Sequence, residues 1–211
     1  MSTAVSEWDT PVTKGAGGGE FKYELCPAGN HPATIIGVIN VGHHEKVRDD
    51  HTTYQQQELV YLLELIEEQS DGSPFIFGLR CARSMNDRST MYDLATSVLG
   101  ETFPENAVFD PRRLVGQACQ VQIVHKEHTN AKGQKATYAN IASKGVKGFP
   151  RKMTPPKPVH EWLVWSVNDG TPCPEDKWLP VIYGKTINQI VAESVEAKQK
   201  AQQQAEDNIA Y

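Results

Sequence analysis

Residues Leu114 to Lys147 read LVGQACQVQIVHKEHTNAKGQKATYANIASKGVK. The pattern predicts two strands joined by a polar turn, because apolar residues recur on either side of a segment from His125 to Lys135 that contains Gly133. The first strand takes its apolar positions from Ala118, Val121, Ile123 and Val124, and the second from Tyr138, Ile141 and Ala142.

The turn of this hairpin is basic, since Lys126, Lys132 and Lys135 surround its glycine. A long basic hairpin with a tyrosine in a polar strand is typical of a protein that binds a phosphate backbone. We therefore take binding of a polyanion as the hypothesis that the rest of the chain must support.

Charge is distributed unevenly along the 211 residues. The net charge of −5 is made up of −8 over Met1 to Phe75, +7 over Ile76 to His160 and −4 over Glu161 to Tyr211. A basic middle between acidic ends is compatible with nucleic-acid binding, and equally with a solvated charged surface that has no ligand.

Composition excludes several classes of protein. The hydrophobic fraction is 39% and the mean hydropathy −0.48, and no apolar run approaches the roughly 20 residues that a spanning helix needs. The N-terminus lacks the pattern of a secretory signal, and the cysteines Cys26, Cys81, Cys119 and Cys173 are too scattered for a zinc site. These features predict a reduced, intracellular protein without metal or cofactor.

Further elements are expected on both sides of the hairpin. Ala33 to Val41 predicts a strand with a bulge or sharp bend at Gly37, and Phe75 to Ala82 predicts another strand, with Phe75, Phe77, Leu79 and Cys81 on one face. Asn86 to Leu99 predicts a helix capped by Asn86 or Asp87 and ended by Gly100. A polar loop is expected from Gly42 to Gln57.

The segment from Glu58 to Glu68 is ambiguous. Leu59, Leu62, Leu63 and Ile66 have helical spacing, so the local pattern slightly favours a helix. If the segment is a strand, the element order becomes that of the OB-fold, a five-stranded Greek-key barrel with a helix between strands three and four. An unrelated α+β domain with the same elements is the alternative.

Four regions are predicted. Residues 1–20 form a disordered lead-in, 21–148 an OB-fold domain, 149–185 a Pro- and Trp-containing irregular extension that packs on the domain, and 186–211 a C-terminal helix, capped by Thr186, with a flexible tail.

Several short motifs resemble a family of small bacteriophage proteins. They are Pro27 to Ala33, Gly37 to Gly42, Leu63 to Leu65, Leu114 to Cys119, Tyr138 to Ile141 and Trp178 to Pro180, spread over Cys26 to Val195. The chain departs from the family pattern in Asn40, where Asp is expected, and in the long loop after Gly42.

Some members of this family are taken as phage single-stranded DNA-binding proteins with an OB-fold. The resemblance therefore implies that Glu58 to Glu68 is a strand, and that the protein binds single-stranded DNA without sequence preference in phage DNA replication or recombination. The alternative is an OB-fold module that binds proteins, as a phage structural or adaptor protein.

Candidate DNA-binding residues come from the basic middle and its aromatics. They are Arg80, Arg83, Arg112, Arg113, Lys126, Lys132, Lys135, Tyr138, Lys144, Lys147, Phe149 and Arg151. The end of the chain resembles the acidic tails that recruit replication partners, through Glu206, Asp207, Ile209 and Tyr211.

Enzymatic activity is not predicted, since the chain has no GxxxxGK[ST], HExxH or GxSxG motif. A weaker alternative is a metal-dependent nuclease that uses carboxylates between Asp49 and Glu68. Their position beside apolar strand residues instead predicts a solvated outer face.

Overall fold

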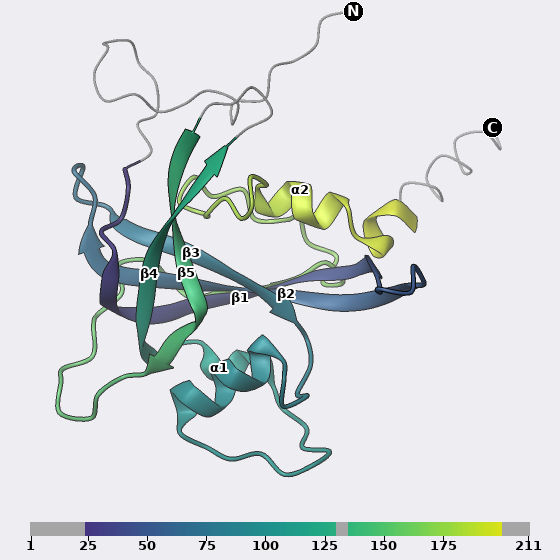
Figure 1. Ribbon diagram of the computed structural model, residues 1–211, viewed down its shortest axis with the longest axis horizontal. Coiled ribbons are helices and arrows are strands. Elements are labelled where there is room, and N and C mark those ends of the chain that lie inside the picture. The colour runs from purple at the N-terminus through teal and green to yellow at the C-terminus, as the bar shows by residue number, and fades with distance from the viewer. Residues whose placement is uncertain (1–23, 130–134, 200–211) are drawn as a thin grey trace, which may run out of the picture.

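A computed structural model describes residues 24–129 and 135–199 of the chain (Figure 1). The predictions for the lead-in, for Lys132 and for the acidic tail lie outside these residues. The described part is mainly β, as expected, with short helices. Its elements are β1 (Gly29–Val47), β2 (Thr53–Glu68), β3 (Pro74–Ala82), α1 (Thr90–Leu99), the 3-10 helix η2 (Pro111–Leu114), β4 (Ala118–Thr129), β5 (Lys135–Gly148), β6 (Leu163–Ser166) and α2 (Ile187–Ala192).

Five strands form an antiparallel path in the order β3-β2-β1-β4-β5. The first half of β1 pairs with β4, and its second half pairs in parallel with β6 along Gly37–Asn40. The register of β1 against β2 shifts between Ile35 and Gly37, which confirms the predicted bulge. A Cβ at Gly37 would collide with the carbonyl oxygen of Leu163, so this glycine lets β6 approach.

The segment from Glu58 to Glu68 is a strand, part of β2, despite its helical spacing. Its side chains alternate between two buried environments: Leu63 and Leu65 pack with the core inside the curved sheet, whereas Val60 and Leu62 pack with a second cluster outside it. A strand that is buried on both faces is a continuous apolar run, which local periodicity does not distinguish from a buried helix.

The polar loop predicted from Gly42 to Gln57 is wrong. β1 continues to Val47 and β2 begins at Thr53, with pairs such as His44 with Gln56 between them. The connection is a short turn in which the amide of Arg48 donates to the carbonyl oxygen of Thr52 at 2.9 Å. Cross-strand pairing satisfies these backbone groups, so the polar side chains do not prevent an extended conformation.

Helix α1 is shorter than predicted at its start. Ser89, rather than Asn86 or Asp87, is the N-cap, and its Oγ accepts from the amide of Tyr92 at 3.1 Å. The side chain of Asn86 instead accepts from the amide of Arg88 in a preceding turn. Gly100 ends the helix with φ 66°, as predicted.

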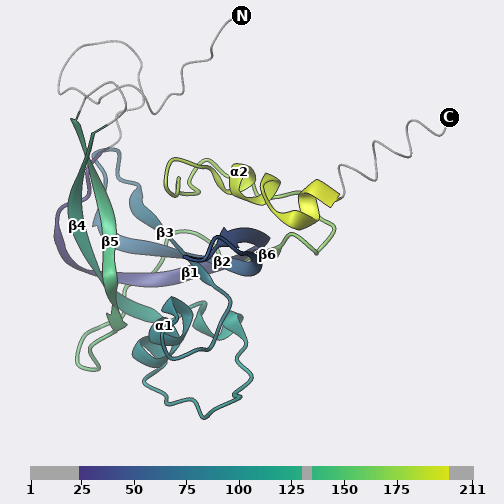
Figure 2. The ribbon, with the colours of Figure 1, turned by 45° about the vertical axis from the view of Figure 1, so that its right-hand side comes forward.

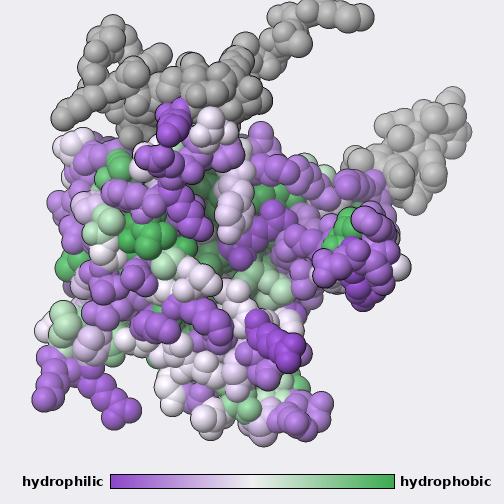
Figure 3. Space-filling model, viewed as in Figure 1, coloured by the Kyte–Doolittle hydropathy of each residue, from purple (hydrophilic) through white to green (hydrophobic). Residues whose placement is uncertain are grey.

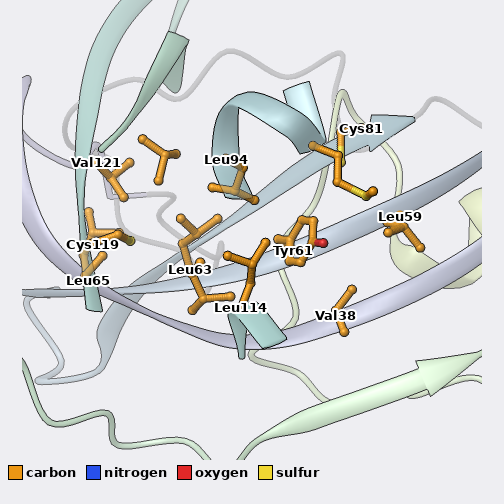
Figure 4. Packing of buried hydrophobic residues seen from close by; sticks show 14 of the residues in the cluster. Val38, Leu59, Tyr61, Leu63, Leu65, Cys81, Leu94, Leu114, Cys119 and Val121 are labelled. Carbon is orange, nitrogen blue, oxygen red and sulfur yellow. The ribbon is translucent and has the colours of Figure 1, made fainter. Parts of the chain in front are cut away.

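The main core lies inside the curve of the sheet. Figure 4 shows Tyr61 and Leu63 from β2, Leu94 from α1 and Leu114 from η2 pointing toward one another, with Val121 from β4 beside them. The apolar stripe of α1 covers one end of this core, and the helix also contacts β5 and β3. Among the described residues β3 and β5 do not pair, so they are the two ends of the five-strand path, and β6 lies off this path beside β1.

A second core lies on the outer face of β1, β2 and β3. It is covered by residues 159–196, which we call the C-terminal strap. The strap contributes the buried side chains of Trp165, Ile182, Ile187 and Ile190, and α2 begins with the predicted cap, Thr186, in a capping box with Gln189. Strand β6 lies in the extension that we expected to be irregular. Figure 2 shows α2 and α1 on opposite sides of the sheet.

Within residues 24–129 and 135–199, no helix has the length and apolar character needed to cross a membrane.

Candidate nucleic-acid interface

The β4–β5 hairpin has two faces of different chemistry. Its register pairs Lys126 with Tyr138 and Glu127 with Thr137, so that successive pairs point to opposite sides. The even-numbered residues of β4, with their partners in β5, point away from the main core. We call this side the lysine face; it consists of Gln120, Gln122, Val124, Lys126 and His128 from β4, and Ala136, Tyr138, Asn140 and Lys147 from β5.

The lysine face contains two cations and no carboxylate. Lys126, Lys147 and Gln122 are exposed, and Tyr138 is half-buried. Within the described residues neither lysine makes an ion pair. A surface with free ammonium groups, side-chain amides and one aromatic ring can bind phosphates and bases together. In the space-filling view, hydrophilic side chains cover most of the visible side of the molecule (Figure 3).

The opposite face of the hairpin is not purely basic. Lys135, a predicted DNA-binding residue, lies 3.9 Å from Glu127 on this side. Nearer the core, the ring Nε2 of His125 is 2.8 Å from the carbonyl oxygen of Cys26 and so joins β4 to the segment before β1. This face therefore offers less net positive charge than the lysine face.

Two of the predicted arginines, Arg112 and Arg113, lie on η2 and are engaged by carboxylates. Asp110 accepts from Arg112 through two oxygens, at 2.9 and 2.7 Å, and these hydrogen bonds lower the pKa of Asp110. Arg113 contacts Glu101 at 2.7 Å and stacks over the ring of Phe109. Both pairs are exposed, so a phosphate would have to compete with a carboxylate for each guanidinium.

The remaining predicted residues are dispersed. Arg83 donates to Gln57 at 3.2 Å, and Lys144 pairs with Asp93 of α1 at 2.9 Å. Phe149 is half-buried and Arg151 exposed on the connector after β5. Of the predicted residues that the structure describes, Lys126, Tyr138 and Lys147 are the ones that share a face of the hairpin.

Arg80 of β3 lies beside β2, whose carboxylates Glu58 and Glu64 are buried. Its Nε donates to Glu58 at 2.7 Å, and Lys46 reaches the same carboxylate at 2.8 Å. Burial raises the pKa of Glu58, but the hydrogen bond from Lys46 and the charge of Arg80 outweigh it, so the net pKa is below the usual value. The guanidinium of Arg80 therefore forms an ion pair with the buried carboxylate of Glu58.

Glu64 fastens the strap to β2. Its buried carboxylate accepts from the amides of Val159 and His160, at 2.5 and 3.0 Å, and contacts Nδ1 of His160 at 2.8 Å. The prediction that these carboxylates form a solvated outer face is thus wrong for Glu58, which is buried in an ion pair with Lys46 and Arg80, and for Glu64, which binds a segment about a hundred residues later. In the part of the chain that is described, no group of three or more His, Cys, Asp or Glu side chains is arranged to hold a metal ion.

Sequence reasoning missed the division of the hairpin into two faces, although a signal for it exists. Gln120, Gln122 and Lys126 share the even positions of a strand whose odd positions Cys119, Val121 and Ile123 are apolar. Counting by two along the strand would have placed Lys126 with the glutamines and separated it from Glu127.

Comparisons with protein-family models and with curated protein sequences found no match to this chain.

Proposed function

We propose that this protein is an OB-fold protein that binds single-stranded DNA without sequence preference and serves phage DNA replication or recombination in the host cytoplasm. The strand order supports the OB-fold, because a Greek-key barrel of this type places strand one between strands two and four. Helix α1, which follows β3, precedes β4 and covers one end of the core, is also typical of that fold.

The observation that carries the functional proposal is the lysine face. Lys126 lies directly across from Tyr138, and Lys147 lies across from Gln120 further along the same side. Ammonium groups provide attraction to phosphates that does not depend on sequence, and a tyrosine ring stacks on any base. These residues lie on strands four and five, and OB-folds use the loop between those two strands to bind oligonucleotides.

A salt titration tests the proposal. A fluorescently labelled single-stranded oligonucleotide is titrated with the full-length protein at several salt concentrations, and affinity is measured by anisotropy. Binding through several phosphates predicts a linear fall of log K with log salt, with a slope of about −0.7 per phosphate contacted. No binding at low salt would refute the proposal. Addition of Mg²⁺ or Mn²⁺ to the same labelled DNA tests for nuclease activity, which would appear as cleavage.

A second candidate, a protein-interaction module, is favoured by apolar side chains around β6. Val159, Trp162 and Val164 are 75%, 57% and 51% exposed. The indole of Trp162 lies against Gly116, where any Cβ would collide with it and where φ is +87°, so this exposed ring is held in a defined position. Positioned exposed aromatics are typical of protein contacts. Replacing Trp162 by Ala would leave DNA affinity unchanged if the ring serves only a protein partner.

A further inference from the structure

The usual ligand surface of an OB-fold is closed in this protein. OB-folds bind oligonucleotides on the outer face of strands two and three. Here that face carries Val60, Leu62 and Ile76, and the strap packs Ile182 and Ile190 onto them. Val60, Leu62 and Ile190 have no exposed surface. To reach this face, DNA would have to remove a hydrophobic core.

Polar contacts also hold the strap in place. Glu64 binds the beginning of the strap at Val159 and His160, and Glu196 at its end binds the amide and Nδ1 of His43 on β1, at 2.9 and 2.5 Å. Displacing the strap would leave the buried Glu64 carboxylate without its three contacts, the amides of Val159 and His160 and the ring Nδ1 of His160, which is costly for a charged group. The β2–β3 face therefore remains covered when ligand binds.

On the premise of the proposed function, we infer that single-stranded DNA instead follows the lysine face, across β4 and β5. With the β2–β3 face covered, the lysine face remains as a surface that combines two unpaired lysines with an aromatic ring and has no carboxylate among its residues. Lys147 sits opposite Gln120, and Lys126 is six residues beyond it along β4. At about 3.4 Å per residue, the two ammonium-bearing positions are roughly 20 Å apart along the strand, a span for several phosphates.

Charge complementarity favours a polynucleotide over a protein on this face. The nine residues of the lysine face include Lys126 and Lys147 but no Asp or Glu. The face also has three side-chain amides, those of Gln120, Gln122 and Asn140. Each amide can donate or accept a hydrogen bond, so it can bind base edges that differ in the position of their donors and acceptors. Tyr138 stands beside Lys126, so a base stacked on the ring would bring its own phosphate near the ammonium group.

Matched charge insertions test the path. Gln122→Glu places a carboxylate on the lysine face, and Thr137→Glu places one at an exposed position of the opposite face of the same hairpin. The path predicts that Gln122→Glu weakens binding of a labelled oligo-dT by at least several-fold at low salt, whereas Thr137→Glu has a smaller effect. Circular dichroism controls for folding of both variants.

Lysine and tyrosine substitutions give an independent readout. Lys126→Ala and Lys147→Ala should each reduce the magnitude of the salt slope by about 0.7, and Lys177→Ala, an exposed lysine on the strap, should leave it unchanged. Tyr138→Leu should weaken binding roughly 5- to 150-fold with little change in slope, while Tyr138→Phe retains affinity.

The outcomes separate this inference from the proposed function. Wild-type protein that does not bind DNA would overturn both. Wild-type binding that is unaffected by Gln122→Glu, Lys126→Ala and Tyr138→Leu would overturn the path and leave DNA binding standing. The Glu64→Gln variant weakens the contacts of Glu64 with Val159 and His160. If this variant bound DNA more strongly than the wild type, the strap would instead compete with DNA for the β2–β3 face.

Discussion

Replacing Ile190 by alanine removes a side chain with no exposed surface from the contact between the strap and the sheet. The lost burial and the cavity left behind cost about 2–5 kcal/mol for a change of this type. For a protein of this size each kcal/mol lowers the melting temperature by roughly 2–4 °C, so Ile190→Ala is expected to melt roughly 4–20 °C lower than the wild type.

Two probes report on different parts of the structure in this experiment. Three of the four tryptophans, Trp162, Trp165 and Trp178, lie in the strap, so in a Trp8→Phe background tryptophan fluorescence follows the strap, whereas far-ultraviolet circular dichroism follows the sheet. Because the strap supplies one side of a shared core, both signals should shift together in urea or on heating. Val181→Ala, at a position that is 40% exposed on the same strap, is the matched control and should change stability by no more than about 0.5 kcal/mol.

The reasoning would be refuted if the fluorescence transition of Ile190→Ala moved to lower urea while the circular dichroism transition stayed at the wild-type midpoint. That result would mean that the strap unfolds as a separate unit and that the sheet is stable without it. The β2–β3 face would then be open to ligands, and the path of DNA along the lysine face would lose its main argument.

Two further predictions concern titratable groups. The pKa of Glu58 is lowered in the folded state, so the stability that its charged form contributes is present above the unfolded pKa near 4.3 and is lost as the pH falls through the folded pKa. The Glu58→Gln variant should therefore be less stable than the wild type at pH 7 and should lose less stability on acidification to pH 3, as measured by urea unfolding. Burial raises the pKa of the thiols of Cys81 and Cys119 to about 12, so both should resist alkylation at pH 8 in the native protein and react quickly in denaturant. Labelling is followed by mass spectrometry, and rapid labelling of the native protein would contradict the placement of these two residues in the core.

Local sequence was most informative where a short-range rule fixes the conformation. The capping oxygen of Thr186 and the left-handed residue Gly100 mark helix ends, and both were predicted from the adjacent residues. The pairing of β4 with β5 was also predicted, because the apolar alternation of both strands lies within one segment. The helix start was missed, because Ser89, Asn86 and Asp87 are all suitable caps and only the observed backbone selects among them.

The ambiguity at β2 has a different origin. Leu59, Leu63 and Leu65 face one core and Val60 and Leu62 face another, so nearly every position is apolar. Alternation, the usual signal of a strand, disappears when both faces are buried. The resemblance to phage proteins led to the right assignment where periodicity favoured a helix.

The sequence alone determined the pairing of β4 with β5 and the chemistry of each strand position, because these depend on residues a few places apart. Only the tertiary structure decided which of the cations face solvent. The strap lies about a hundred residues beyond β2, yet it binds the buried carboxylate of Glu64, and Arg80 forms an ion pair with the buried Glu58. Sequence patterns record the period of an element but not what covers it, and this is why Lys126, Tyr138 and Lys147 emerged as one surface only in the folded chain.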